Sequence, residues 1–201
     1  MLGTHGRIDG LVNNAGGQFR APMNTISTKG FEAVVRNNLT GGFIFMREVY
    51  NRWMEAHGGA IVNIIADMWH SMPNMGHSGA ARAGMLNFTY TAAVEWAAAG
   101  IRVNAVAPGW IASSGLTKYP EAARARMKTL PRYVPLKRFG TESEVSAAIV
   151  FLLSEAAAFI SGSCLRVDGA VPNTRPDLDL PDHNRSKPYR GFPLETQIDF
   201  L

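Results

Sequence analysis

The amino-acid sequence predicts an α/β fold built on a parallel sheet. Short runs of β-branched and small apolar residues recur along the chain, separated by segments of helical composition of ten residues or more. Strands and helices that alternate in this way form parallel sheets, because each helix returns the chain to the start of the next strand. Small or polar residues follow three of the strands, and parallel sheets bind ligands at those carboxyl ends.

Length and composition are those of a globular protein. The chain has 201 residues, of which 46% are hydrophobic and 18% charged, with a net charge of +4, and it is most simply one domain. Its basic residues are dispersed, which argues against a nucleic-acid partner and agrees with an anionic small ligand. No apolar run is long enough to span a membrane and no signal-peptide core precedes residue 10, so we expect a cytoplasmic protein. Cys164 has no second cysteine to pair with and cannot form a zinc site alone, so no metal is predicted.

The first elements are a helix end, a strand and a turn. Leu2 to Gly6 is typical of the end of a helix. Residues 8–12 form a short buried strand. Asn13 to Gly17 is a turn of small residues, where a backbone can approach a ligand closely.

A long helix and a second strand follow. The helix is predicted from Thr28 to Trp53, with a local break between Asn37 and Gly42 because these residues are poor helix formers. Gly58 and Gly59 end it. Residues 60–65 (AIVNII) form a buried strand, and residues 66–76 form the loop that leaves its carboxyl end.

The next helix, Ser78 to Ala99, is the most apolar segment. It carries only two charged residues, Arg82 and Glu95, so we expect it to be buried. Gly100 stops it. Residues 101–106 then form another buried strand.

The remaining elements are shorter. After a loop at residues 108–114, helices are predicted at 121–129 and 143–153, the second with Thr141 as its N-cap. Residues 163–167 form the last strand. The proline-rich segment 171–201 is predicted to be an irregular tail.

Two polar residues stand together on the apolar helix. Ser78 and Arg82 are four residues apart and therefore lie on one face, one turn from each other. One interpretation is structural: Ser78 or His77 caps the helix while Arg82 extends to solvent. The other is functional, and the three loops at the predicted binding edge favour it.

Several motifs, in order, resemble those of the short-chain dehydrogenase/reductases. They are NNAG at residues 13–16, Asn38 in NNLTG, the strand IVNII, the S-x-x-x-R of Ser78 and Arg82, RVNAVAPG at residues 102–109 and VDGA at residues 167–170. The resemblance runs from residue 8 to about residue 170. Within the family, NNAGGQF, GGAIVNII and HSGAARAG are most similar to the branch of peroxisomal trans-2-enoyl-CoA reductases and citronellol dehydrogenase-like proteins, which is related to dienoyl-CoA reductases.

The resemblance implies the C-terminal portion of a doubly wound parallel-sheet Rossmann fold, with residues 1–170 as a partial domain. The family's Gly-rich turn, which holds the dinucleotide pyrophosphate at a helix N-terminus, does not occur in these 201 residues. We therefore expect a fragment or truncated form of a longer enzyme, with an exposed edge at strand 8–12.

The resemblance also implies site residues for NADP or NAD. Asn14, Ala15 and Gly16 correspond to residues that back the adenosine ribose, and Arg82 stands in place of the lysine that binds the nicotinamide ribose. The residues expected to contact the nicotinamide carboxamide and the phosphates are Pro108, Gly109, Ile111 and Ser113. Asn38 corresponds to the asparagine whose backbone holds a water in the proton relay, and Ser78 replaces the catalytic tyrosine.

Two substitutions change the expected acid-base chemistry. A serine hydroxyl is a far weaker acid than a tyrosine beside a cation, and arginine cannot release its proton. The serine that the family carries after the second strand is also replaced, by Ile65 and Ala66. Other candidate proton donors are Asp67, His70, His77 and Tyr90. Each has a structural alternative: Asp67 accepts from backbone N–H groups of its loop, the two histidines are solvated or cap a helix, and Tyr90 is a core or interface residue.

The predicted function is hydride transfer to or from an enoyl-CoA thioester, or a terpenoid or fatty alcohol or aldehyde. Reduction of an enoyl thioester needs only a polarised carbonyl and a proton for the α carbon. The alternative is a catalytically silent family member that serves as an oligomerisation subunit. In either case the resemblance implies a homo-oligomer that assembles through the helices at residues 28–53 and 78–98.

Overall fold

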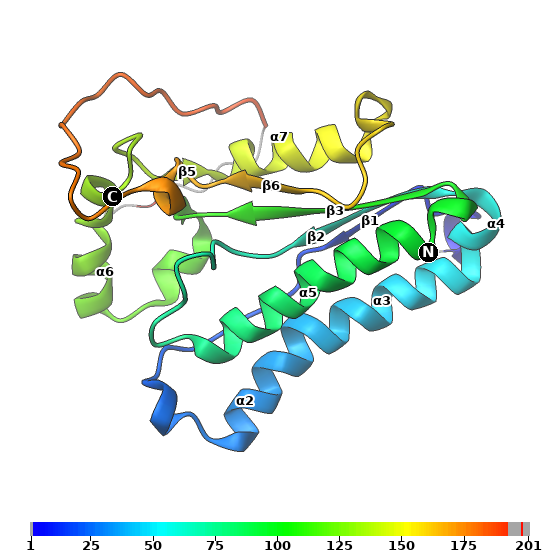
Figure 1. The fold of residues 1–201 in the computed structure, drawn as a ribbon, viewed down its shortest axis with the longest axis horizontal. Coiled ribbons are helices and arrows are strands. Elements are labelled where there is room, and N and C mark those ends of the chain that lie inside the picture. Colours follow the sequence, from blue (N-terminus) through cyan, green and yellow to red (C-terminus); the bar gives the residue numbers. More distant parts are fainter. Residues whose placement is uncertain (1, 193–197, 199–201) are drawn as a thin grey trace. The chain divides into compact units, whose positions relative to one another are not determined.

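The computed structural model describes residues 2–192 and residue 198, which form two compact units (Figure 1). Unit 1 comprises the chain up to Ala107 together with Ile149–Leu165. Unit 2 comprises Pro108–Ala148 and the chain from Arg166 onward. The assignment of residues 1–170 to one domain stays a prediction.

The main sheet confirms the predicted α/β class. Its strands are β1 (Gly10–Asn13), β2 (Gly59–Ile64), β3 (Ile101–Pro108) and β6 (Cys164–Val167), in the order β1-β2-β3-β6. The pairs β1·β2 and β2·β3 are parallel, with Leu11 opposite Ile61 and Ile61 opposite Val103. All four predicted strands are present, with ends shifted by at most two residues. β1 is an edge strand, and its Val12 is 39% exposed.

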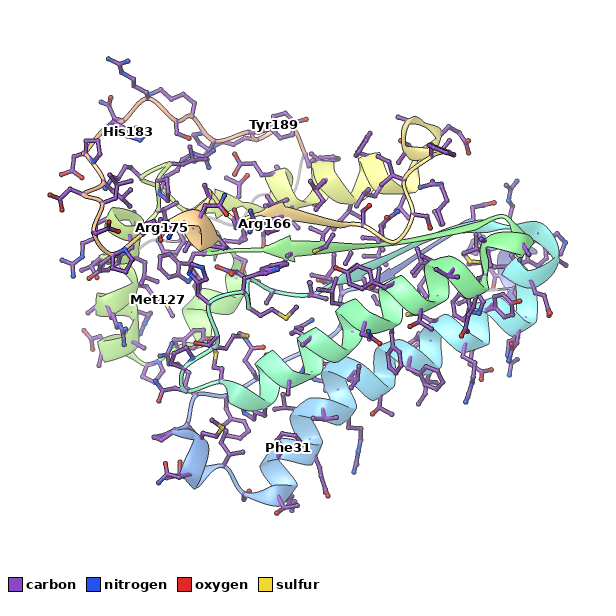
Figure 2. All side chains as sticks on the ribbon, viewed as in Figure 1. Phe31, Met127, Arg166, Arg175, His183 and Tyr189 are labelled. Carbon is purple, nitrogen blue, oxygen red and sulfur yellow. The ribbon has the colours of Figure 1, made fainter. Side chains whose placement is uncertain are left out.

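The predicted break in the first long helix is wrong. After the short α1 (Leu2–His5), the helical backbone runs unbroken through α2 (Thr28–Val35), α3 (Gly41–Val49) and α4 (Glu55–His57), joined by π-helical segments Arg36–Thr40 and Tyr50–Met54 (Figure 2 labels Phe31 on α2). The Asn38 side chain donates to the carbonyl of Val34, the partner that the backbone N–H of residue 38 has in an α-helix. A polar side chain therefore accompanies a wider helical turn instead of a break. Gly58, with φ of 72°, ends the helix as predicted.

The long helix α5 (Gly76–Glu95) lies beside α3 on the same face of the sheet (Figure 1). Gly84 permits close approach, since a Cβ there would lie 3.0 Å from Leu39 Cδ2. A 3₁₀ turn at Ala97–Ala99 and the left-handed Gly100 end the segment. The expectation that the whole helix is buried is wrong, because Tyr90 and Val94 are 44% and 79% exposed. The helix therefore has one buried face and a second face on which apolar side chains are exposed.

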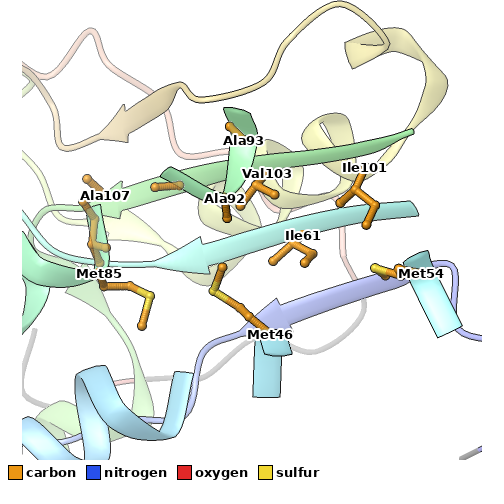
Figure 3. Packing of buried hydrophobic residues seen from close by; sticks show 11 residues of the cluster. Met46, Met54, Ile61, Met85, Ala92, Ala93, Ile101, Val103 and Ala107 are labelled. Carbon is orange, nitrogen blue, oxygen red and sulfur yellow. The ribbon is translucent and has the colours of Figure 1, made fainter. Parts of the chain in front are cut away.

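The core of unit 1 lies between the sheet and these helices (Figure 3). Ile61 on β2 and Val103 on β3 are completely buried, and Met46, Met54 and Met85 from the helices pack in the same cluster. Unbranched methionine side chains fill irregular gaps between a twisted sheet and helices. The burial of these apolar side chains stabilises the position of the strands whose ends carry the candidate site residues.

A chain of polar side chains crosses this core. Asn13 on β1 donates to Asn63 Oδ1 on β2 over 2.8 Å, and Asn63 donates to Thr89 Oγ1 on α5 over 2.9 Å. Thr89 in turn donates to the carbonyl of Met85. Because buried polar groups are costly when unpaired, this chain fixes the register between the strands and α5.

Unit 2 contains β4 (Ile111–Ala112), β5 (Gly140–Thr141), α6 (Glu121–Met127) and the start of α7 (Glu142–Leu153). The predicted cap of α7 is confirmed: Thr141 Oγ1 accepts from the Glu144 N–H, and Glu144 accepts from the Thr141 N–H, which is a capping box. From residue 171 to residue 192 the structure has one short helical turn, Val171–Asn173, and otherwise neither helix nor strand. Residues 193–197 and 199–201 lie outside the described residues, so the predicted tail 171–201 stays a prediction. None of the described helices is both long and apolar enough to cross a bilayer.

Candidate functional site

Three segments of unit 1 meet at Gly16. A Cβ on this residue would lie 2.5 Å from Asn38 Oδ1 and 2.8 Å from Arg82 Nη2. The turn after β1, the π-helical segment and α5 therefore converge on one point, and only glycine leaves room for both side chains. Asn14 and Ala15 precede Gly16 in this turn and are exposed.

Asn38 fastens the turn to the helix. It is 4% exposed, its Nδ2 donates to the carbonyl of Gly17 over 2.6 Å, and its Oδ1 accepts from the Gly17 N–H over 3.2 Å. With the bond to Val34, every polar atom of the side chain is used. The role implied for its backbone, in a proton relay, stays a prediction.

Arg82 is anchored at the end of β2. Its Nη1 donates to the carbonyl of Ile64 over 2.6 Å, so the alternative in which it extends to solvent is wrong. Its Nε is buried and has no hydrogen-bond partner among the described residues. Burial lowers the pKa of the Arg82 guanidinium, which nevertheless stays a cation at neutral pH because its reference value is so high.

His77 and Ser78 are both 1% exposed at the start of α5. The Ser78 hydroxyl does not cap the helix; it is buried and makes no hydrogen bond within residues 2–192 and 198. The His77 ring takes one helix-end N–H, since Nδ1 accepts from Ser78 N over 2.9 Å. A neutral ring then carries its hydrogen on Nε2, which also lacks a partner in the described part of the chain. Phe19 packs edge-on against this ring, with centroids 4.5 Å apart.

Three unmet polar atoms within two turns of one helix are unusual. A buried donor or acceptor without a partner costs about 1–3 kcal/mol, and native proteins leave few of them. The cluster of His77 Nε2, Ser78 Oγ and Arg82 Nε therefore has the character of a ligand site that presents hydrogen bonds to a bound molecule.

The other candidate proton donors are dispersed. Asp67 is partly buried on the loop between β2 and α5, and His70 on the same loop is exposed. Tyr90 is 44% exposed two turns beyond Arg82, which agrees with the interface alternative. Within the described residues no group of three or more His, Cys, Asp or Glu side chains is arranged to hold a metal ion.

Four predicted cofactor residues belong to unit 2. The Gly109 N–H donates to the carbonyl of Val167, and a Cβ on Gly109 would lie 2.8 Å from Asp168 Cα, so this position also requires a close approach. Pro108 ends β3, Ile111 pairs with Gly140 in the small sheet, and Ser113 is partly buried. Their convergence with Arg82 stays a prediction.

Sequence reasoning missed two features. The Ile64 carbonyl that anchors Arg82 is a backbone group, for which the sequence carries no signal. A cavity of about 420 Å³ in unit 2 is lined in part by Asp168. In the sequence, Asp168 was noted only as a member of the VDGA motif that resembles the family. An acidic residue directly after a strand is itself a signal for a binding edge.

Comparisons with known proteins agree on one family. A family model described as enoyl-(acyl carrier protein) reductase matches residues 1–171. The probable 2,4-dienoyl-CoA reductase of Bacillus subtilis is 40% identical over 168 residues, covering 82% of this chain and 66% of that protein. Among solved structures, the citronellol catabolism dehydrogenase of Pseudomonas aeruginosa is 58% identical, with a TM-score of 0.73 and coverage of 85% of this chain and 65% of that one. A putative 2-deoxy-D-gluconate 3-dehydrogenase of Agrobacterium tumefaciens with bound NADP is 32% identical, with a TM-score of 0.76 over 83% and 68% of the two chains. The chain thus spans about two thirds of the length of the relatives that it matches.

Proposed function

Because the chain belongs to the short-chain dehydrogenase/reductase family, we propose that it serves hydride transfer between NADP or NAD and a small organic substrate. The observation that carries the proposal is the pair of unmet buried donors, Ser78 Oγ and Arg82 Nε, one helical turn apart on α5, with Arg82 beside the Gly16 turn.

These residues fit a dinucleotide. Arg82 and Ser78 offer hydrogen-bond donors of the kind that ribose hydroxyls accept, and the lack of a Cβ at Gly16 lets the Arg82 side chain approach the turn. In this proposal Asn14, Ala15 and Gly16 back the adenosine ribose, while the segment containing Pro108, Gly109, Ile111 and Ser113 holds the nicotinamide end. When bound, the nicotinamide ring supplies or accepts the hydride.

The acid-base groups favour enoyl thioester reduction over alcohol oxidation. Oxidation of an alcohol needs a base at the hydroxyl, and neither Ser78 nor Arg82 serves as one at neutral pH. Reduction of a conjugated thioester needs a polarised carbonyl, which a buried cation and a hydroxyl donor provide. Asp67, on the loop that leads to α5, is the proposed carrier of the proton for the α carbon. The dienoyl-CoA reductase relative supports this ranking, and a terpenoid or fatty alcohol or aldehyde is second.

We also propose that the protein is cytoplasmic and a homo-oligomer. The outer faces of the helices support the assembly. Phe45 on α3 is 58% exposed and Val94 on α5 is 79% exposed, although both are apolar. Exposed apolar patches of this kind mark interfaces. We therefore propose that copies pair through the helices at residues 28–53 and 78–98.

A cofactor titration tests the proposed activity. The fluorescence of NADPH or NADH is measured while the whole chain or the Arg82→Met variant is added. The control variant is Arg36→Met, which removes an exposed cation from the same unit. We expect a saturable fluorescence change with one of the cofactors. Arg82→Met should weaken the affinity at least about tenfold, since hydrogen bonds from charged donors are lost. Arg36→Met should leave the affinity unchanged. A folded wild-type chain that binds neither cofactor would leave the silent-subunit alternative in place.

A further inference from the structure

Residues 19–23 of unit 1, which we call the cover segment, lie against the start of α5. The Phe19 ring packs edge-on against His77, with centroids 4.5 Å apart. Met23 Sδ lies 3.5 Å from the point where a Cβ of Gly76 would stand, so its thioether reaches the first residue of the helix. The two ends of the segment thus contact neighbouring residues of α5.

The cover segment contributes to the burial of His77. This histidine is 1% exposed, whereas Phe19, which packs on its ring, is 43% exposed. A backbone hydrogen bond from Ala21 N to the Asn74 carbonyl, 2.9 Å long, ties the segment to the loop before α5. A segment held by a few such contacts opens more easily than the core does. Loss of one contact should therefore uncover His77 more often.

Met23 is the contact that chemistry can change. It is 77% exposed, whereas Met46, Met54 and Met85 are at most 2% exposed. The other methionines that the structure describes are half-buried: Met68, Met72, Met75 and Met127. Because the oxidation of methionine follows the exposure of its sulfur, a peroxide should react with Met23 first.

Oxidation would replace an apolar contact by a polar one. A peroxide transfers one oxygen atom to the thioether: an S–O bond forms, the O–O bond breaks, the sulfur loses two electrons and hydrogen peroxide becomes water. The sulfoxide is polar and hydrated, and pressing it against the helix would remove part of its water. We therefore expect the contact between Met23 and Gly76 to be lost.

We propose that Met23 is a site of reversible oxidation by peroxides, and that its sulfoxide releases the cover segment from the start of α5 and uncovers His77. The proposal rests on the exposure of the thioether, its contact with Gly76 and the packing of Phe19 on the His77 ring. It requires no nicotinamide cofactor and stands or falls separately from the proposed hydride transfer.

The first measurement locates the oxidation. The whole chain is treated with a limiting amount of hydrogen peroxide, and each methionine is followed by mass spectrometry of its peptides. We expect Met23 to react at least about tenfold faster than Met46 or Met85, and clearly faster than Met127. A methionine sulfoxide reductase should reverse the change. Equal rates at Met23 and Met127 would overturn the proposal.

The second measurement follows the uncovering of His77. Diethyl pyrocarbonate acylates the ring nitrogens of histidines that it can reach, and the exposed His70 is an internal reference on the loop before α5. After oxidation of Met23, His77 should be modified at least about threefold faster, because the segment opens more often. The rate at His70 should not change. An unchanged or slower rate at His77 refutes the release.

Three variants assign the effect to one sulfur. Met23→Leu keeps an apolar side chain that peroxide does not oxidise, so the rate at His77 should stay slow after treatment. Met23→Gln carries a polar group from the start and should show the fast rate without peroxide. Met127→Leu removes a methionine of unit 2 and should respond to peroxide as the unchanged chain does. If Met23→Leu responds in the same way as the unchanged chain, the oxidation acts elsewhere and the proposal fails.

Discussion

Two arginines in this protein are used in opposite ways. In unit 2, Arg138 donates to both oxygens of Glu144, at 2.9 and 2.6 Å, to Ser186 Oγ and to the carbonyl of Lys187. In unit 1, Arg82 makes one hydrogen bond, to the carbonyl of Ile64, and its buried Nε has no partner in the described residues. A guanidinium whose donors are all used holds the chain together, whereas the unmet donor of Arg82 supports the proposal that this residue binds a ligand.

The partners of Glu144 show what the first arrangement does. Glu144 also accepts from the N–H groups of Thr141 and Tyr189, and Thr141 Oγ1 donates to the carbonyl of Tyr189 (Figure 2 labels Tyr189 on the tail). The ion pair therefore ties the tail, which lies beyond the residues that the family model matches, to the start of α7. Its role is structural, and the contrast with Arg82 can be tested by stability measurements.

The largest loss of stability is expected for Arg138→Met. The change leaves Glu144 partly buried without its cation and releases Ser186 and Lys187, so the free energy of unfolding should fall by about 2–4 kcal/mol. Urea denaturation measures it. Arg185→Met, at an exposed tail position, is the control and should change stability by less than about 0.5 kcal/mol. A loss equal to that of the control would remove the distinction between the two arginines.

The next largest effect is expected at Gly16. The added methyl group of Gly16→Ala would lie 2.5 Å from Asn38 Oδ1, and displacement of that side chain should cost about 1–3 kcal/mol. Gly17→Ala is a matched control, because its nearest neighbour, Asn37 Nδ2, is 3.6 Å away. Thermal unfolding of the two variants should therefore differ, and equal midpoints would mean that the turn moves freely away from Asn38 and Arg82.

A smaller effect is expected from protonation of Glu144. Partial burial raises the pKa of its carboxyl, but hydrogen bonds from Arg138, Thr141 and Tyr189 outweigh burial and hold it below the usual 4.5. A carboxyl whose pKa is lower in the folded state stabilises the protein above its unfolded value, and this contribution is lost as the pH falls below about 4.5. Its size is roughly 1 kcal/mol after allowance for partial exposure. Glu144→Gln should flatten the stability profile below that pH.

The sequence predicted the elements that local composition controls. Runs such as AIVNII and IRVNAV contain the β-branched residues that buried strands require, and Gly58 and Gly100 stop helices at positive φ where they were expected to. The small-residue turn at Gly16 and the polar pair on α5 were also found, because glycine and a lone arginine on an apolar helix are local signals.

What the sequence could not predict depends on contacts between distant segments. Asn38 was identified as a helix breaker, but its bonds to Val34 and Gly17 accompany a π-helical turn instead. The anchoring of Arg82 depends on a carbonyl 18 residues away, and the unmet atoms around it appear only once burial is known. Likewise, nothing local in the tail marks the partners of Arg138 and Glu144.

The smallest effect on stability, and the sharpest test of the comparison, is expected for Arg82→Met. The variant leaves the Ile64 carbonyl without its donor, which costs about 1 kcal/mol. It also removes a desolvated cation whose Nε has no partner among the described residues, and a methionine of similar length fills the space. The two contributions oppose each other, so urea denaturation should show a change within about 1 kcal/mol of zero. A loss as large as that of Arg138→Met would mean that Arg82 holds the fold, and the interpretation of its unmet donor as a ligand contact would then fail.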